Sequence, residues 1–240
     1  MRKLFLKGVS VLSDLKLRVS YGILGNQNGI SNFGARGLWV GGASYPNGVG
    51  EADQAGTSPL QLSNPNLRWE RTNQVDAGID VALFDGRLSF TTDVYYKYIR
   101  DLLISKQVSG ITGYINYVTN EGELSNKGIE FPLNTVNIDR NDFEWRTQFN
   151  LTRNIRKVEK LATPFIYGSR DMVRNKEGYP MYSFWLYQQL YVDAETGKAV
   201  FEDRNGDGKI TVADRQIIGN ANPDFFGGLT NSHFSTETKS

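Results

Sequence analysis

Long runs in which apolar and polar residues alternate constrain this chain more than any other feature of its sequence. Side chains of a β-strand point to its two faces in turn, so a run with period two predicts a strand with one apolar face. In every run the charged residues fall on the polar parity. Five segments alternate in this way: LKLRVSYGI (15–23), QVDAGIDVAL (74–83), RLSFTTDVYY (87–96), GIEFPLNT (128–135) and FEWRTQFNLT (143–152).

The connections between the alternating segments follow a second pattern. Asp85-Gly86 predicts a two-residue hairpin turn, and Asp139 to Asp142 predicts another short turn. Long polar stretches at 24–73, 98–127 and 155–224 separate these hairpins. Tight turns on one side and long loops on the other are typical of an outer-membrane β-barrel. We expect six spanning strands, at 14–23, 74–84, 87–97, 128–138, 143–154 and 225–235.

In a barrel wall of this kind one face of the sheet contacts lipid and the other faces the water-filled lumen. We expect the apolar set to face lipid: Leu15, Leu17, Val19, Ile79, Val81, Leu83, Phe90, Val94, Phe131, Phe149 and Leu151. We expect the polar set to face the concave lumen: Asp76, Asp80, Asp93, Glu130, Arg146 and Gln148. Pro132 interrupts this pattern because proline cannot donate to a strand ladder, so it predicts either a bulge or a local break.

A soluble β-sandwich is the alternative, because its strands alternate in the same way with the apolar face turned inward. Two observations favour the barrel. The predicted strands reach about ten residues, the length that a tilted strand needs to cross a bilayer, whereas about five or six is usual in globular proteins. Loops of about thirty residues are also rare in compact soluble domains.

Composition excludes several classes of function. The chain has 27 basic and 26 acidic residues, so no charge excess predicts a nucleic-acid partner. His233 is its only histidine and it has no cysteine, which argues against a Ser-His-Asp triad or a multi-histidine metal site. We therefore expect no enzyme and no cofactor. No apolar run predicts a transmembrane helix, and Lys7 argues against a signal peptide.

The stretch FEDRNGDGKITVADRQIIG (201–219) has the oxygen ladder of a twelve-residue calcium loop. The predicted ligands are Asp203, Asn205, Asp207, the backbone carbonyl of Lys209, and Asp214. The β-like segment before the loop, and Gly219 and Pro223 after it, argue against the paired helices of an EF-hand. The other interpretation is a polar turn whose carboxylates accept hydrogen bonds from nearby N–H groups.

Aromatic side chains crowd the segment YPMYSFWLYQQLYV (179–192). Flat rings on an outward loop could stack on sugar rings, and this makes Tyr182, Trp185 and Tyr187 weak candidates for substrate binding. We favour the alternative that these rings pack the loop against itself or lie at the membrane interface.

The succession of motifs resembles one family. It runs through LKLRVSYGILGNQ (15–27), NPNLRWERTNQVDAGIDVALFDGRLSFTTDVYYKYIRDLL (64–103), GELSNKGIEFPLNTVNI (122–138), FEWRTQFNLTRNIRKVEKL (143–161) and DRNGDGKITVADRQIIGNANPDFFGGLTN (203–231). In this order the motifs resemble the C-terminal part of the barrel of SusC/RagA-type TonB-dependent outer-membrane transporters.

The resemblance implies an all-β fold, in which the six strands belong to an antiparallel barrel of about 22. The whole chain, 1–240, would be part of that barrel, with periplasmic turns and an extracellular loop at 155–224. We find no plug domain, no TonB-engaging motif and no terminal aromatic strand, so we expect an interior slice. The resemblance also implies uptake of a glycan oligosaccharide, or less often a peptide, in a Gram-negative outer membrane. A SusD-like surface lipoprotein and TonB would be the partners.

Overall fold

The structure is a computed structural model that describes residues 11–46, 48–49 and 52–235. Two expectations fall partly outside these residues. The expected absence of a signal peptide concerns residues 1–10, and the expected absence of a terminal aromatic strand concerns in part residues 236–240.

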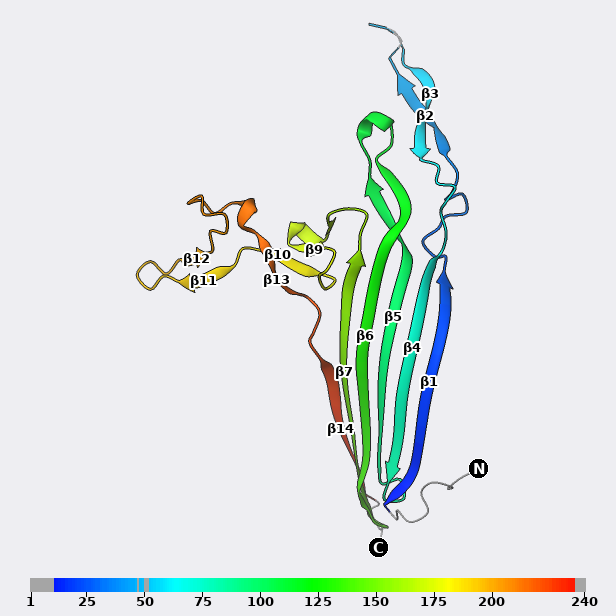
Figure 1. Cartoon of the computed structure of the whole chain (residues 1–240), viewed down its shortest axis with the longest axis vertical. Coiled ribbons are helices and arrows are strands. Elements are labelled where there is room, and N and C mark those ends of the chain that lie inside the picture. The colour runs from blue at the N-terminus through cyan, green and yellow to red at the C-terminus, as the bar shows by residue number, and fades with distance from the viewer. Residues whose placement is uncertain (1–10, 47, 50–51, 236–240) are drawn as a thin grey trace.

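Six long antiparallel strands form one sheet in the order β1-β4-β5-β6-β7-β14 (Figure 1). They are β1 (Leu12–Asn26), β4 (Glu70–Leu83), β5 (Leu88–Gln107), β6 (Asn116–Asp139), β7 (Phe143–Lys160) and β14 (Phe226–Ser235). All six predicted strands are therefore confirmed, and most are longer than predicted because backbone pairing continues beyond the apolar parts of the alternation.

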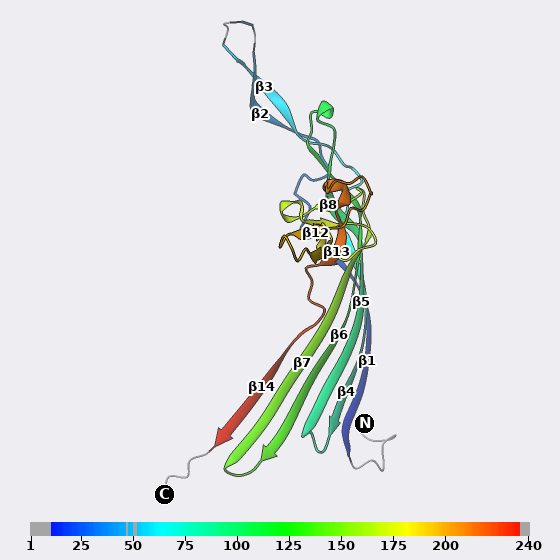
Figure 2. The ribbon, with the colours of Figure 1, turned by 90° about the vertical axis from the view of Figure 1, so that its left-hand side faces the viewer.

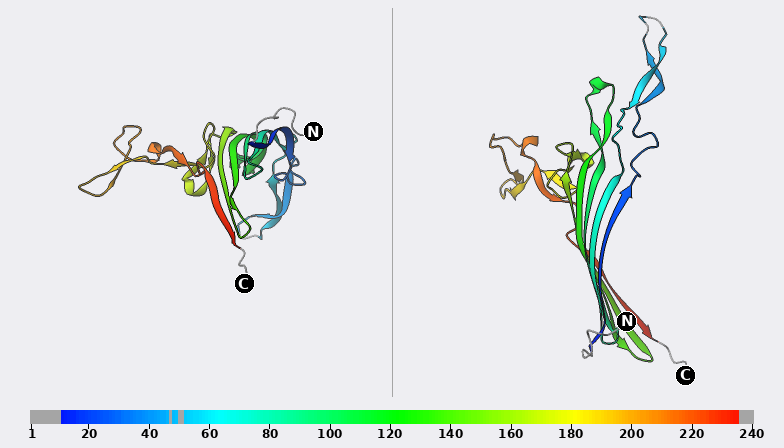
Figure 3. Two further views of the ribbon diagram at one scale, coloured as in Figure 1. Left: turned by 90° about the horizontal axis from the view of Figure 1, so that it is seen from below. Right: turned by 45° about the vertical axis from the view of Figure 1, so that its right-hand side comes forward.

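The sheet is a single curved layer, which Figure 2 shows from its edge and Figure 3 from below. Among the described residues the only buried apolar side chains are Ile104 and Val158, and both lie near the upper ends of their strands. A sandwich would bury the apolar face of the sheet between two layers. Here that face carries some of the most exposed apolar side chains, with Leu17 73% and Val19 81% exposed.

The two tight turns lie at the same end of the sheet (Figure 1). The turn between β4 and β5 has four residues rather than the predicted two, because pairing ends at Leu83–Leu88. Phe84, Asp85 and Gly86 all have positive φ angles, and Gly86 N donates to Leu83 O at 3.1 Å. The turn between β6 and β7 is held by Arg140 N donating to Phe143 O at 3.0 Å.

The predicted loop at 98–127 is wrong in its extent, since β5 runs to Gln107 and β6 begins at Asn116. The register between these strands shifts between Ile99 and Leu103, where Asp101 has a φ of 58°. Such a bulge inserts a residue and reverses the parity of the side chains that follow. The alternation therefore disappears from the sequence although the strand continues.

Pro132 neither bulges nor breaks its strand. Pairing of β5 with β6 has the same register at Phe90–Leu133 and at Asp93–Glu130, on either side of the proline. At the two positions between them β6 does not pair with β5, whereas its pairing with β7 continues without interruption through Pro132–Asn150. The missing N–H of proline thus removes ladder contacts on one side only.

Smaller elements lie beyond the other end of the sheet. The first connection holds the hairpin of β2 (Leu38–Tyr45) and β3 (Gln54–Gln61), and η1 (Gly110–Thr112) lies between β5 and β6. The last connection forms two small sheets, one ordered β13-β10-β9-β8 and the other pairing β11 with β12. Its elements are β8 (Ile166–Tyr167), η2 (Ser169–Asp171), β9 (Val173–Asn175), β10 (Ser183–Leu186), β11 (Gln189–Val192), β12 (Ala199–Phe201), η3 (Val212–Asp214) and β13 (Gln216–Asn220).

The last connection is fastened to the upper edge of β7, above the point where β14 stops pairing. Val158 N donates to Tyr179 O at 3.0 Å, and Gly178 N donates to Val158 O at 2.9 Å. Met181 N donates to Arg156 O at 3.1 Å. The connection thereby covers Val158, which is 1% exposed. No helix in the described part of the chain is long and apolar enough to cross a membrane.

Candidate functional site

The polar face of the sheet carries a network of charges centred on Arg18. The Arg18 guanidinium donates to Asp80 at 2.9 and 3.0 Å and to Asp93 at 2.8 Å. Thr91 Oγ1 also donates to Asp80 at 2.9 Å. The three strands β1, β4 and β5 are therefore linked by side chains as well as by their ladders.

Gly78 leaves the space that this network needs. It lies opposite both Arg18 and Asp93 in the sheet register. A Cβ atom at residue 78 would lie 2.1 Å from Asp93 Oδ1 and 2.8 Å from an Arg18 terminal nitrogen. The alternation of residues 15–23 predicts that Arg18 lies on the polar face, but not that it forms this bridge, because the bridge depends on the register of three strands.

The predicted two-face arrangement agrees with the register. Asp80, Asp93 and Glu130 belong to one face of β4, β5 and β6, and Arg146 and Gln148 continue that face onto β7. The opposite face carries the apolar set, for example in the cross-strand row Leu15, Val81, Phe90, Leu133, Phe149 and Leu229.

Aromatic side chains lie at both margins of the apolar face. At the lower margin the ring of His233 lies 5.6 Å from Trp145 and 6.0 Å from Phe143, centroid to centroid. At the upper margin Tyr21 and Tyr96 fall in one cross-strand row, which reaches β7 at Ile155. Ten residues of β7 from Trp145 to Ile155 span about 33 Å along the strand. At a tilt of about 40° this projects to about 25 Å, the height of the apolar band of an outer-membrane barrel.

The calcium-like ladder lies in an exposed turn between β12 and η3. Asp203 accepts from the N–H groups of Gly206 and Gly208 at 2.8 and 2.7 Å, and Asp207 accepts from Lys209 N at 2.8 Å. Asn205 Nδ2 donates to Asp207 at 2.9 Å. These contacts are the ones that a polar turn requires.

Asp214 is the fully buried member of the ladder, with 0% of its surface exposed. It accepts from Thr211 N at 2.7 Å and from Arg204 N at 3.0 Å, and it completes a capping box at η3 with Thr211. These bonds, that from Thr211 N foremost, hold the pKa of Asp214 below its ordinary value, although desolvation acts in the opposite direction.

The carboxylates among the predicted metal ligands are occupied by hydrogen bonds within the turn. In the part of the chain that the structure describes, no group of three or more His, Cys, Asp or Glu side chains could hold a metal ion. The entering element is β12 and the following one is a 3₁₀ turn, in keeping with the argument against an EF-hand. Calcium binding by Asp203, Asn205, Asp207, Lys209 and Asp214 stays a prediction.

Two of the three aromatic substrate candidates pack against arginines of the same connection. The Arg174 guanidinium lies 4.4 Å from the Trp185 ring and 4.0 Å from the Phe165 ring, and Arg215 lies 5.1 Å from the Tyr187 ring. Asp171 forms ion pairs with both arginines, at 3.0 and 3.2 Å. This is the packing arrangement that the sequence favoured.

Tyr182 lies apart from these two rings, 45% exposed and with a φ of 59°. Substrate contact by Tyr182, Trp185 and Tyr187 stays a prediction. Neither arginine was singled out from the sequence, since the contact depends on how β9, β10 and β13 fold together.

Residues 8–208 match the protein family described as TonB dependent receptor-like, beta-barrel. The chain belongs to the TonB-dependent receptors. It is 35% identical to TonB-dependent receptor SusC of Bacteroides thetaiotaomicron over 94% of this chain and 24% of that protein. It is also 35% identical to TonB-dependent receptor P3 of Formosa agariphila, over 95% of this chain and 25% of that protein.

A solved transporter structure has the same fold. The structure described as the RagAB peptide transporter matches with a TM-score of 0.81 and 25% identity, over 97% of this chain and 26% of that one. The chain thus spans about a quarter of the length of its relatives. The receptor family places it in the outer membrane of a Gram-negative bacterium, and this family consists of transporters, not enzymes. Both expectations are confirmed, as is the all-β barrel fold.

Proposed function

We propose that this chain forms one wall of a TonB-dependent importer for glycan oligosaccharides. The observation that supports the barrel wall is a one-layer sheet whose two faces differ. One face has exposed apolar side chains, such as Leu17, Val19 and Leu229, and the other has the ion pairs of Arg18 with Asp80 and Asp93. Such a sheet requires lipid on one side and a water-filled lumen on the other. The soluble sandwich has no support in this geometry.

The proposed partners follow from the relatives. A SusD-like surface lipoprotein would deliver the substrate at the end where the long connections lie, and TonB would supply the energy from the periplasmic side. The glycan rests on the resemblance of the motifs to SusC/RagA-type transporters, and the chain is 35% identical to SusC. A peptide is the second candidate, because the RagAB structure is described as a peptide transporter.

Uptake by cells tests the substrate class. A strain that lacks the complete receptor is compared with its complemented parent for uptake of fluorescent oligosaccharides and of fluorescent peptides of matched mass. We expect the deletion to abolish uptake of at least one oligosaccharide and to leave the peptides unaffected. Loss of peptide uptake alone would overturn the glycan assignment and leave the transporter intact.

We also propose that calcium, bound through the Asp203 to Asp214 ladder, stiffens the last connection. That connection has more than sixty residues, so ordering it carries a large entropic cost. Extracellular calcium modules bind calcium with dissociation constants on the order of 10⁻⁴ to 10⁻³ M. A loop with Asp in place of the usual bidentate Glu at its last position can have an affinity this weak and still be filled outside the cell.

A further inference from the structure

Two cations interrupt the upper part of the lipid-facing surface. The uppermost row of the apolar band contains Lys127, and the row below it contains Arg153. The other members of these rows are Tyr21, Val75, Tyr96 and Ile155 above, and Val19, Ala77, Val94 and Ile129 below. Lys127 and Arg153 are thus the only charged side chains in the two rows.

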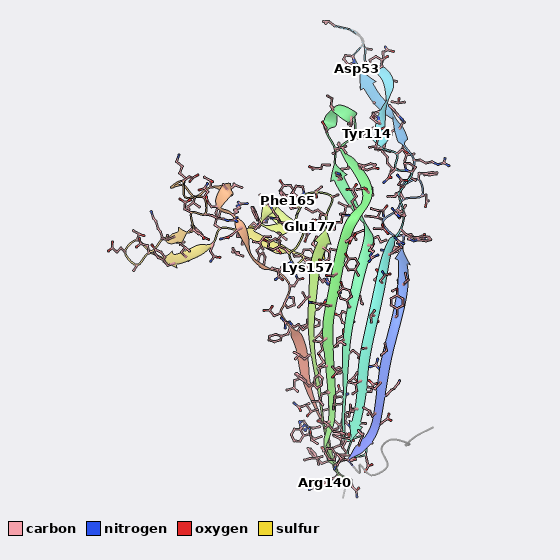
Figure 4. All side chains as sticks on the ribbon, in the orientation of Figure 1. Asp53, Tyr114, Arg140, Lys157, Phe165 and Glu177 are labelled. Carbon is pink, nitrogen blue, oxygen red and sulfur yellow. The ribbon has the colours of Figure 1, made fainter. Side chains whose placement is uncertain are left out.

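The two cations are diagonal neighbours on adjacent strands. Lys127 lies opposite Ile155, and Arg153 lies opposite Ile129, so each is offset by two residues from the other. Diagonal neighbours lie about 7–8 Å apart in an antiparallel sheet, which long side chains can bridge. Both are exposed and, among the described residues, neither forms an ion pair. The anions near them are Glu159, which interacts electrostatically with Lys127, and Asp224, which lines a shallow pocket with Arg153. The next cation upward, Lys157, is paired with Glu159 at 2.8 Å (Figure 4 shows Lys157 near the upper end of β7).

The depth of the pair limits what can neutralise it. Arg153 is eight residues above Trp145, about 26 Å along the strand and about 20 Å in height at a tilt of 40°. That places it just inside the upper margin of a band about 25 Å tall, where a cation costs much less than at the midplane. A long side chain can direct its charge upward to the head-group level.

We propose that Lys127 and Arg153 bind the phosphate group of an anionic lipid in the outer leaflet. A guanidinium offers two parallel N–H donors to phosphate oxygens and an ammonium adds a point charge, so the pair matches a phosphate monoester. The exposed side chains of Ile155, Ile129 and Val94 lie beside and below the cations, where the acyl chains of the same lipid would pack. A free phosphate ion would make no use of this apolar surround.

A matched pair of double variants tests the site in the complete receptor. Lys127→Gln with Arg153→Gln removes the proposed site. Lys97→Gln with Arg156→Gln removes the same charges from the row of Asn126, on the opposite face of the sheet. Each receptor is reconstituted into phosphatidylcholine nanodiscs, and its association with spin-labelled phosphatidic acid and phosphatidylcholine is measured by electron paramagnetic resonance.

We expect the wild type to select phosphatidic acid, the Lys127/Arg153 variant to lose at least about tenfold of that selectivity, and the Lys97/Arg156 variant to keep it. The variant Lys127→Arg should also keep the selectivity for phosphatidic acid, because it changes the shape of the side chain but not its charge. Heat-modifiable mobility on gels shows that each variant barrel is folded. Equal selectivity in wild type and Lys127/Arg153 variant, or equal loss in both double variants, would overturn the site. Displacement of the lipid by 10 mM inorganic phosphate, on the order of a saturating amount, would show that a free anion rather than a lipid is the ligand.

Discussion

Gly78 lies directly opposite Asp93 in the ladder between β4 and β5, and the missing side chain of the glycine leaves room for the Arg18–Asp93 ion pair. We predict that Gly78→Ala displaces this pair and lowers the midpoint of urea unfolding in detergent. Gly22→Ala is the control, because a Cβ at residue 22 meets nothing within 4 Å. Equal midpoints for the two variants would show that the network contributes nothing to stability.

A charge on the lipid-facing surface should be far more costly than the same charge one residue away. Leu151 lies on the apolar face of β7, and Asn150 lies on the polar face. We predict that Leu151→Arg reduces the free energy of unfolding in lipid vesicles by about 2–4 kcal/mol, the cost of an arginine near the bilayer midplane. Asn150→Arg should change it by less than about 1 kcal/mol. Similar costs at both positions would contradict the assignment of the faces.

The last connection should loosen at low pH through Asp214. Because the folded-state pKa of Asp214 lies below its ordinary value of 3.8, the folded form binds fewer protons than the unfolded form. Its contribution to stability is therefore complete well above pH 4 and is lost as the pH falls through the folded-state pKa. We predict that the protection factors of the Arg204 and Thr211 amides, which correct for the intrinsic pH dependence of exchange, fall below about pH 4. In Asp214→Asn these protection factors should not change with pH. Unchanged protection in the wild type down to pH 2 would show that the carboxylate does not hold the turn.

Calcium should protect the same connection from proteolysis if the ladder binds it. We predict that millimolar calcium, relative to chelator, slows cleavage between residues 161 and 225 severalfold in the wild type. Asp207→Ala should abolish this difference, since Asp207 is a predicted ligand and its side chain otherwise only accepts hydrogen bonds within an exposed turn. Equal cleavage rates in wild type with calcium, wild type with chelator and the variant would identify the ladder as a turn alone.

The spanning sheet could be predicted from the sequence because lipid and lumen impose opposite polarity on successive residues. This constraint does not act beyond the membrane margin, and the strands that lie there could not be predicted from alternation. The upper part of β5 and β6 was missed because a bulge at Asp101 reverses the parity. The small sheets of the last connection were missed because their strands have only two to five residues. They are held by contacts such as that of Arg215 with Asp171, between segments distant in sequence.

The polar side of the site was predictable only in part. Parity alone assigned Asp80 and Asp93 to the lumen face, but their partner Arg18 depends on the pairing of β1 with β4. The oxygen ladder was visible from its spacing. What the spacing could not show is that each carboxylate already accepts backbone N–H groups, with Asp214 buried among them.

Single-cysteine scanning of β7 tests the central claim most directly, because this part of the receptor contains no cysteine. Any cysteine elsewhere in the receptor is first replaced by serine. Cysteines are placed one at a time at residues 147 to 152 of the complete receptor, labelled with a fluorophore and reconstituted into lipid vesicles. Quenching by brominated lipid is then compared with quenching by iodide. We predict a strict alternation, in which residues 147, 149 and 151 are quenched by the lipid and residues 148, 150 and 152 by iodide. Quenching by iodide alone at all six positions, or by neither agent at 147, 149 and 151, would contradict a lipid-facing barrel wall.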